Sequence, residues 1–242
     1  MKKFKFILSV FFIVLFSNKA FAVSATGAAS VYKITMTYLE LCETGSTLAS
    51  CSNPLVVGSG SSGLINIADT TAGVAAASYG DFTKVPFGKT YSHYQVTLKR
   101  SVTIKGSVSD GTNTCYTVSN SGDISKNVVG SEDSADEAEI TAYMAMTISG
   151  LGDEINSVSA GDGSGTVQDA GTVDDDDEFF QVRGAFTKTI KLEPNKIPTL
   201  QLAFGTSAAL GYEGSNGGCE AAIGQAQGLY GAKPDVTATV ID

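Results

Sequence analysis

Apolar and polar residues alternate one by one along much of this chain, and this pattern limits the possible folds more than any other feature. Between Ser92 and Lys99, every second residue from Tyr94 to Leu98 is apolar, and the residues between them are polar. A period of two residues is typical of a half-buried β-strand, whereas a helix needs 3.6. The clearest predicted strands are 31–41, 92–99, 102–108, 140–148, 185–192, 199–204 and 235–241, and shorter candidates are 54–57, 64–67, 115–118 and 179–182.

Glycine-rich turns separate most of these predicted strands. The turn signals are residues 58–63, 110–111, 121–122, 150–152, 161–165 and 214–218. No such signal divides 91–109, so we expect the chain to bend or bulge within 99–106. Helical signals are restricted to 131–138 and 219–228. Many short strands with glycine-rich turns predict an all-β fold, an antiparallel sandwich or barrel with at most one or two short helices.

The first 22 residues have the three parts of a bacterial Sec signal peptide. Lysines lie near the start, an apolar run extends from Phe6 to Phe16, and Ala20 and Ala22 form an A-x-A cleavage site. The apolar run is too short to span a bilayer, which needs roughly 20 residues. We therefore expect cleavage after Ala22 and export to the periplasm, the cell surface or the medium, with no membrane span in the mature chain 23–242.

The mature chain is expected to be strongly acidic. The full sequence has a formal net charge of −9, and losing the four lysines within residues 1–22 would leave about −13. Nucleic acids and anionic lipid surfaces bind proteins through basic patches. The charge therefore argues against both as partners.

The cysteines predict disulfides rather than a metal site. The chain has four, Cys42, Cys51, Cys115 and Cys219, an even number in an exported sequence. Of the three possible pairings we favour Cys42–Cys51 with Cys115–Cys219, because a loop marked by turn-forming residues separates the first two. Zinc is disfavoured, since no C-x-x-C pair occurs and the single histidine is remote from every cysteine in the sequence.

We expect one elaborated β-sandwich domain over residues 23–242, with residues 149–178 as a mobile acidic insertion. Five consecutive acids end this insertion: Asp174, Asp175, Asp176, Asp177 and Glu178. Oxygen ligands on flexible backbone could hold calcium, but no EF-hand or glycine-rich calcium repeat is present. A run of like charges is usually a solvated loop. We therefore predict a loop and no cofactor, with calcium as the weaker alternative.

No catalytic residues are predicted from the motifs. His93 is the only histidine, and its alternation places it on the polar face of a strand, as expected of a surface residue. The chain has neither a G-x-S-x-G elbow nor a phosphate-binding glycine loop. Its 25 carboxylates provide no positional constraint for acid–base chemistry. The sequence therefore favours a protein that is not an enzyme.

In composition the chain resembles bacterial surface and fibre subunits, a likeness that no specific motif carries. We predict a secreted or cell-surface structural protein, a self-associating subunit of a surface layer, a pilus-like fibre or a matrix fibre. Its partners would be copies of itself or other surface proteins. One alternative is a monomeric secreted or periplasmic ligand-binding module with a mouth formed by loops in 79–94 and 211–230. A less favoured alternative is a carboxylate-dependent β-sandwich hydrolase.

Terminal strands are the expected route to self-assembly. Residues 23–30 form a small-residue tail that leads into a strongly alternating segment, and the chain ends in a second alternating strand. Such segments can add to the sheet of a neighbour through backbone hydrogen bonds. The candidate residues are Tyr32, Ile34, Met36, Tyr38, Val236, Ala238 and Val240. The alternative is that both strands pair inside their own domain.

Overall fold

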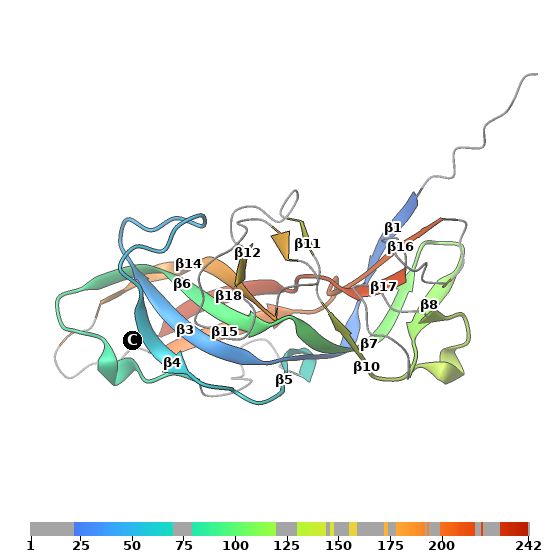
Figure 1. Ribbon diagram of the computed structural model, residues 1–242, viewed down its shortest axis with the longest axis horizontal. Coiled ribbons are helices and arrows are strands. Elements are labelled where there is room, and N and C mark those ends of the chain that lie inside the picture. The colour runs from blue at the N-terminus through green and yellow to red at the C-terminus, as the bar shows by residue number, and fades with distance from the viewer. Residues whose placement is uncertain are drawn as a thin grey trace, which may run out of the picture.

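The computed structural model of the chain is built almost entirely of antiparallel strands in several sheets that pack together (Figure 1). It describes residues 22–69, 79–119, 130–143, 146–147, 155–158, 172–173, 178–191, 193, 199–215, 219 and 228–241. Helix in this part of the chain is limited to three single 3-10 turns, η1 (Ile67–Asp69), η2 (Phe82–Lys84) and η3 (Ser134–Asp136). The predicted all-β, sandwich-like fold is confirmed.

A five-stranded sheet forms one half of the molecule. Its strands, in spatial order, are β12 (Ile155–Val158), β14 (Phe179–Lys191), β6 (Thr90–Lys99), β3 (Met36–Glu43) and β4 (Leu55–Ser59). Two further strands, β15 (Thr199–Gly205) and β18 (Asp235–Ile241), pair with each other and form a ribbon, the β15–β18 ribbon. The ribbon packs over the apolar face of the five-stranded sheet, with β18 beside β14.

The other half contains a six-stranded sheet and a three-stranded sheet. The first has the order β5 (Ile65–Asn66), β2 (Ala29–Ile34), β7 (Ser101–Ser109), β8 (Thr114–Thr117) and β9 (Gly130–Ser131), with β10 (Ile140–Tyr143) also paired to β7. The second has the order β1 (Ala22–Gly27), β16 (Leu210–Ser215) and β17 (Gly228–Gly231). A small separate pair joins β11 (Met146–Thr147) to β13 (Thr172–Val173).

Several chain segments run through both halves and make the molecule long (Figure 1). Only Arg100 separates β6 from β7, and only Thr35 separates β2 from β3. Arg100 is buried, and its backbone N–H donates to the carbonyl of Glu178 at 2.8 Å, so the chain changes sheets at this residue. The predicted bend within 99–106 is confirmed.

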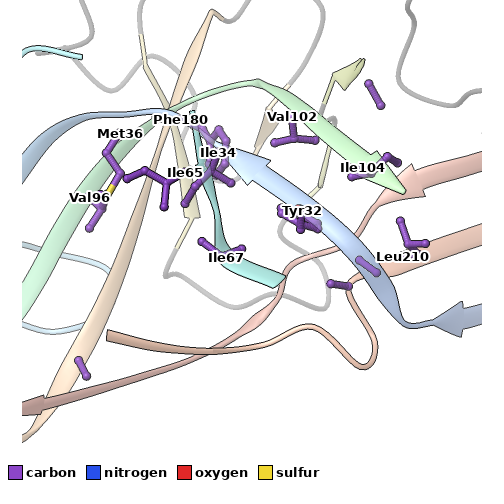
Figure 2. Close-up of a cluster of buried hydrophobic side chains, with 14 of the residues drawn as sticks. Tyr32, Ile34, Met36, Ile65, Ile67, Val96, Val102, Ile104, Phe180 and Leu210 are labelled. Carbon is purple, nitrogen blue, oxygen red and sulfur yellow. The ribbon is translucent and has the colours of Figure 1, made fainter. Parts of the chain in front are cut away.

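The hydrophobic core extends through both halves, and Figure 2 shows its central part. Tyr32 of β2, Ile104 of β7 and Leu210 of β16 are at most 1% exposed. Burying a side chain of this size contributes about 1.5–3 kcal/mol. The Tyr32 hydroxyl donates to the carbonyl of Ala232 at 2.9 Å, which ties β2 to the segment that precedes β18. Burial raises the pKa of this phenol.

Some predicted boundaries are wrong, because tertiary packing overrides local signals. The candidates 179–182 and 185–192 form the single strand β14, since Gly184 lies in the strand directly beneath the ring of Tyr94. The helical signal in 131–138 gives only η3, which Asp133 caps by accepting the N–H of Ala135 at 2.9 Å. The other helical candidate, 219–228, lies mostly outside the described residues.

Strands also occur where none was expected. Nothing in the alternation predicted β1, β16 or β17. Within the expected acidic insertion, β12 pairs with β14 at the edge of the five-stranded sheet, and β13 pairs with β11. The segment 149–178 is therefore not a loop throughout, and the rest of it, apart from Glu178, lies outside the described residues.

Candidate functional site

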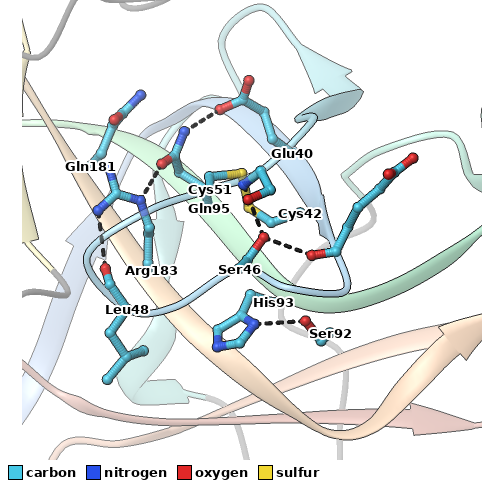
Figure 3. The surroundings of a disulfide bond; sticks show 12 residues. Glu40, Cys42, Ser46, Leu48, Cys51, Ser92, His93, Gln95, Gln181 and Arg183 are labelled. Atoms are coloured by element: carbon cyan, nitrogen blue, oxygen red, sulfur yellow. Dashed lines mark hydrogen bonds between the residues drawn. A yellow bond between two sulfur atoms is a disulfide. The ribbon is translucent and has the colours of Figure 1, made fainter.

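Both predicted disulfides are present, one in each half of the molecule. Cys42–Cys51 joins β3 to the loop that follows it, and its two Cα atoms are 5.1 Å apart. Cys115–Cys219 joins β8 to the residue that precedes β17 by nine positions, with Cα atoms 5.3 Å apart. The first bond lies beside the most extensive side-chain hydrogen-bond network of the described residues (Figure 3).

Three residues form a polar row across the five-stranded sheet, on the face opposite the core. The strand register places Glu40 of β3 opposite Gln95 of β6, and Gln95 opposite Arg183 of β14. The Gln95 amide donates to Glu40 Oε2 at 2.6 Å, and Arg183 Nε donates to Gln95 Oε1. Gln95 and Arg183 are each only 6% exposed. The polar face of β6 is therefore buried at this point and does not face solvent.

The loop closed by the Cys42–Cys51 disulfide, residues 43–50, lies beside this row (Figure 3). The carbonyl of Leu48 in this loop accepts a hydrogen bond from Arg183 Nη1 at 3.0 Å. Ser46 fixes the loop, because its hydroxyl donates to the Glu43 carbonyl at 2.7 Å and accepts the N–H of Ser52 at 2.9 Å. The disulfide thus holds the carbonyl oxygen of Leu48 against the buried guanidinium of Arg183.

Burial lowers the pKa of Arg183, and the charge of Glu40 offsets part of this effect. The guanidinium nevertheless remains charged, because arginine is not deprotonated in proteins. The hydrogen bonds of Arg183 and Gln95 together join three strands and the disulfide loop, so the polar row has the arrangement of a structural network.

Replacing Arg183 with methionine should lower the free energy of unfolding by about 2 kcal/mol. Methionine keeps an apolar stem but leaves the Gln95 and Leu48 carbonyl oxygens without this donor, while removing a buried charge recovers part of the loss. Lys191→Met, at the exposed end of the same strand, is the matched control and should change stability by less than about 0.5 kcal/mol. Urea denaturation of both variants with intact disulfides measures the difference, and equal stabilities would contradict the assigned role.

His93 is half-buried rather than fully exposed. Its Nδ1 lies 2.8 Å from the hydroxyl of Ser92, and burial lowers the pKa of the imidazole. A serine–histidine nucleophile needs a carboxylate on the second ring nitrogen. No carboxylate of the described residues hydrogen-bonds to His93, so the pair has no orienting acid in this part of the molecule.

The calcium candidates fall largely beyond the described residues, which exclude Asp174, Asp175, Asp176 and Asp177. Glu178 is described and exposed, and its backbone carbonyl accepts the N–H of Arg100. Nowhere in the described ranges do three or more potential metal-ligating side chains form a group. The calcium alternative therefore stays a prediction.

The candidate assembly residues lie in strands that pair inside their own chain. β2 has neighbours on both sides, as has β3, and Tyr32, Ile34 and Met36 are buried in the core. Tyr38 is half-buried. In β18, Ala238 is buried, and Val236 and Val240 pack partly exposed against the core. Of the candidate strands, β18 lies at an edge, because it belongs to the two-stranded β15–β18 ribbon, and β1, which was not predicted, lies at an edge of the three-stranded sheet.

An apolar cavity lies between the five-stranded sheet and the β15–β18 ribbon. It has a volume of about 60 Å³ and is partly open to solvent. Its wall includes Tyr94, Phe180, Leu202 and Phe204, and Lys233 is the only charged residue among the described residues that line it. Of the loops expected to form a ligand mouth, 79–94 contributes Tyr94 to this wall, and none of the described residues of 211–230 lines it.

The disulfides indicate the environment of the protein, whereas comparisons with known proteins give no function. Two disulfides indicate an oxidising, exported environment. No helix in the described part of the chain is long and apolar enough to cross a membrane. Searches against family models, curated proteins and solved structures find no match for this chain. A function must therefore be inferred from the molecule's own geometry.

Proposed function

We propose that the mature chain is an exported structural subunit that associates with copies of itself into a surface layer, a pilus-like fibre or a matrix fibre. The observation that carries this proposal is the position of β1. This strand lies at one end of a long molecule, and the C-terminus lies at the other (Figure 1). β1 pairs with β16 on one side, and no strand of the described residues pairs with its other side.

The composition of β1 favours further pairing. An exposed edge offers unpaired N–H and C=O groups to another strand, and proteins usually block such edges with lysine, proline or a bulge. In the mature chain the strand reads Val-Ser-Ala-Thr-Gly, whose side chains carry no charge and include no proline. Its edge can therefore accept or supply a strand through backbone hydrogen bonds.

The best complementary edge in the opposite half is β15. Among the described residues it pairs only with β18. The edge strand β4 is a poorer acceptor, because its Val57 carbonyl already accepts the N–H of Asp81 at 2.7 Å and the ring of Tyr79 packs on Gly58. Pairing of β1 with β15 of the next copy joins two different surfaces, and such heterologous contacts give open filaments unless the rotation closes.

The test is the size of the oxidised mature protein at high concentration, by size-exclusion chromatography and electron microscopy. Polymers should form, and deleting residues 23–26 should abolish them while leaving a folded monomer. Ala203→Lys, which adds a charge on β15, should have the same effect without altering β1. Leu64→Ser, at a loop residue that is 67% exposed, is the control and should leave polymers intact.

Ile34→Pro cannot test self-association, although Ile34 is one of the candidate assembly residues. Ile34 is 5% exposed in the internal strand β2, so this variant would unfold the core. If the wild-type mature protein stays monomeric at every concentration, the proposal is wrong. If polymers survive both the deletion and Ala203→Lys, assembly uses other surfaces and the β1–β15 contact is wrong.

A further inference from the structure

The cavity between the five-stranded sheet and the β15–β18 ribbon has features of a ligand site. In the described part of the chain, the two strands of the ribbon cover this face of a five-stranded sheet. On the sheet side Val96 and Phe180 are buried, whereas Leu202 and Phe204 on the ribbon remain partly exposed. The ribbon therefore leaves apolar surface that a further apolar group could cover.

The chemistry of the wall selects an alkyl chain. Apart from Lys233, the described residues that line the cavity are apolar or aromatic. The hydroxyl of Tyr32, which also lines it, is already bonded to the Ala232 carbonyl. Water needs two to four polar partners to be stable in such a space, so a hydrocarbon group is the better occupant. Its small volume of about 60 Å³ favours one unbranched chain over a ring system or a two-chain lipid.

Lys233 supplies a charge beside this apolar space. It precedes β18, in the short segment whose backbone Tyr32 holds in place, and it is half-buried. Burial lowers the pKa of its ammonium group, and the nearby charge of Asp235 offsets part of that effect. A half-desolvated cation beside an alkyl-sized cavity is complementary to an anion that carries an apolar tail.

We propose that this cavity binds a single-chain alkyl carboxylate, such as a medium-chain fatty acid, with its tail against Val96, Phe180 and Leu202 and its carboxylate beside Lys233. The site is separate from β1 and does not depend on self-association.

The experiment is a calorimetric titration of the oxidised mature protein with decanoate and with decanol, both below their aggregation limits. Decanoate should bind saturably at one site, and more tightly than decanol by about tenfold. Lys233→Met should weaken decanoate by about tenfold and leave decanol unchanged. Asp235→Asn, which removes the competing carboxylate, should strengthen decanoate. Lys191→Met, at an exposed lysine elsewhere, is the control and should change neither.

A space-filling variant tests the position of the tail. Leu202→Trp on the ribbon should reduce the affinity for both ligands at least tenfold, with thermal melting to show that the variant is folded. If this variant does not fold, Val236→Phe on the partner strand provides the same test, since Val236 also lines the cavity. The proposal is overturned if decanoate does not saturate, if Lys233→Met binds it as tightly as wild type, or if a folded space-filling variant binds unchanged.

Discussion

Replacing Cys115 and Cys219 together with alanine is expected to lower the free energy of unfolding by about 4–5 kcal/mol. The two cysteines are 104 positions apart, and closing a loop of that length removes this much conformational freedom from the unfolded chain. The bond also fixes a local junction, because the Cys219 carbonyl accepts the N–H of Gly130 in β9 at 2.8 Å. Guanidinium denaturation of the wild type and the double variant measures the loss.

The matched control is the double alanine variant of Cys42 and Cys51. These cysteines are only 9 positions apart, so the same estimate gives a loss of about 3 kcal/mol. Removing Cys115–Cys219 should thus lower the free energy of unfolding by about 2 kcal/mol more than removing Cys42–Cys51. Equal losses would contradict the chain-entropy explanation. A larger loss for the short loop would assign that excess to the contact between Leu48 and Arg183.

The sequence predicted β6 and β3 of the five-stranded sheet well, because these strands bury one face and therefore alternate. It missed β12, which lies within the expected acidic insertion. It could not predict β16 or the length of β14, since each contains a glycine within the strand. Gly184 lies beneath the ring of Tyr94, and Gly211 lies beneath the ring of Tyr230. A glycine that makes room for an aromatic ring cannot be distinguished from a turn glycine in one sequence. β1 was missed because its small residues provide no strong alternation.

The polar row shows the same limit for the candidate site. Alternation correctly placed Gln95 and His93 on the face of β6 that is opposite the core. It could not show that Gln95 and Arg183 are buried, because that depends on a disulfide loop folding across the sheet. The cavity was also beyond prediction, since its wall combines strands from β2 to β18 and depends on how two layers pack.

Gly106→Ala is expected to lower the free energy of unfolding by about 3–4 kcal/mol. Gly106 lies in β7 opposite Ala29, where the chain passes from β1 to β2, and its φ is 151°. An added Cβ would overlap the carbonyl oxygen of Ala28 and lie 2.7 Å from Leu210 Cδ1. Backbone strain and overpacking each cost about 1–3 kcal/mol, and the carbonyl cannot rotate away as a side chain would.

Gly111→Ala is the matched control for this variant. Gly111 also has a positive φ, 89°, but an added Cβ would meet no atom within 4 Å. It should therefore cost only about 1 kcal/mol, the backbone term alone. The difference between the two variants in chemical denaturation isolates the crowding where β1 crosses onto β7. Equal losses in the free energy of unfolding would mean that β1 moves aside at little cost. Gly106→Ala should then also change the self-association that we propose for β1.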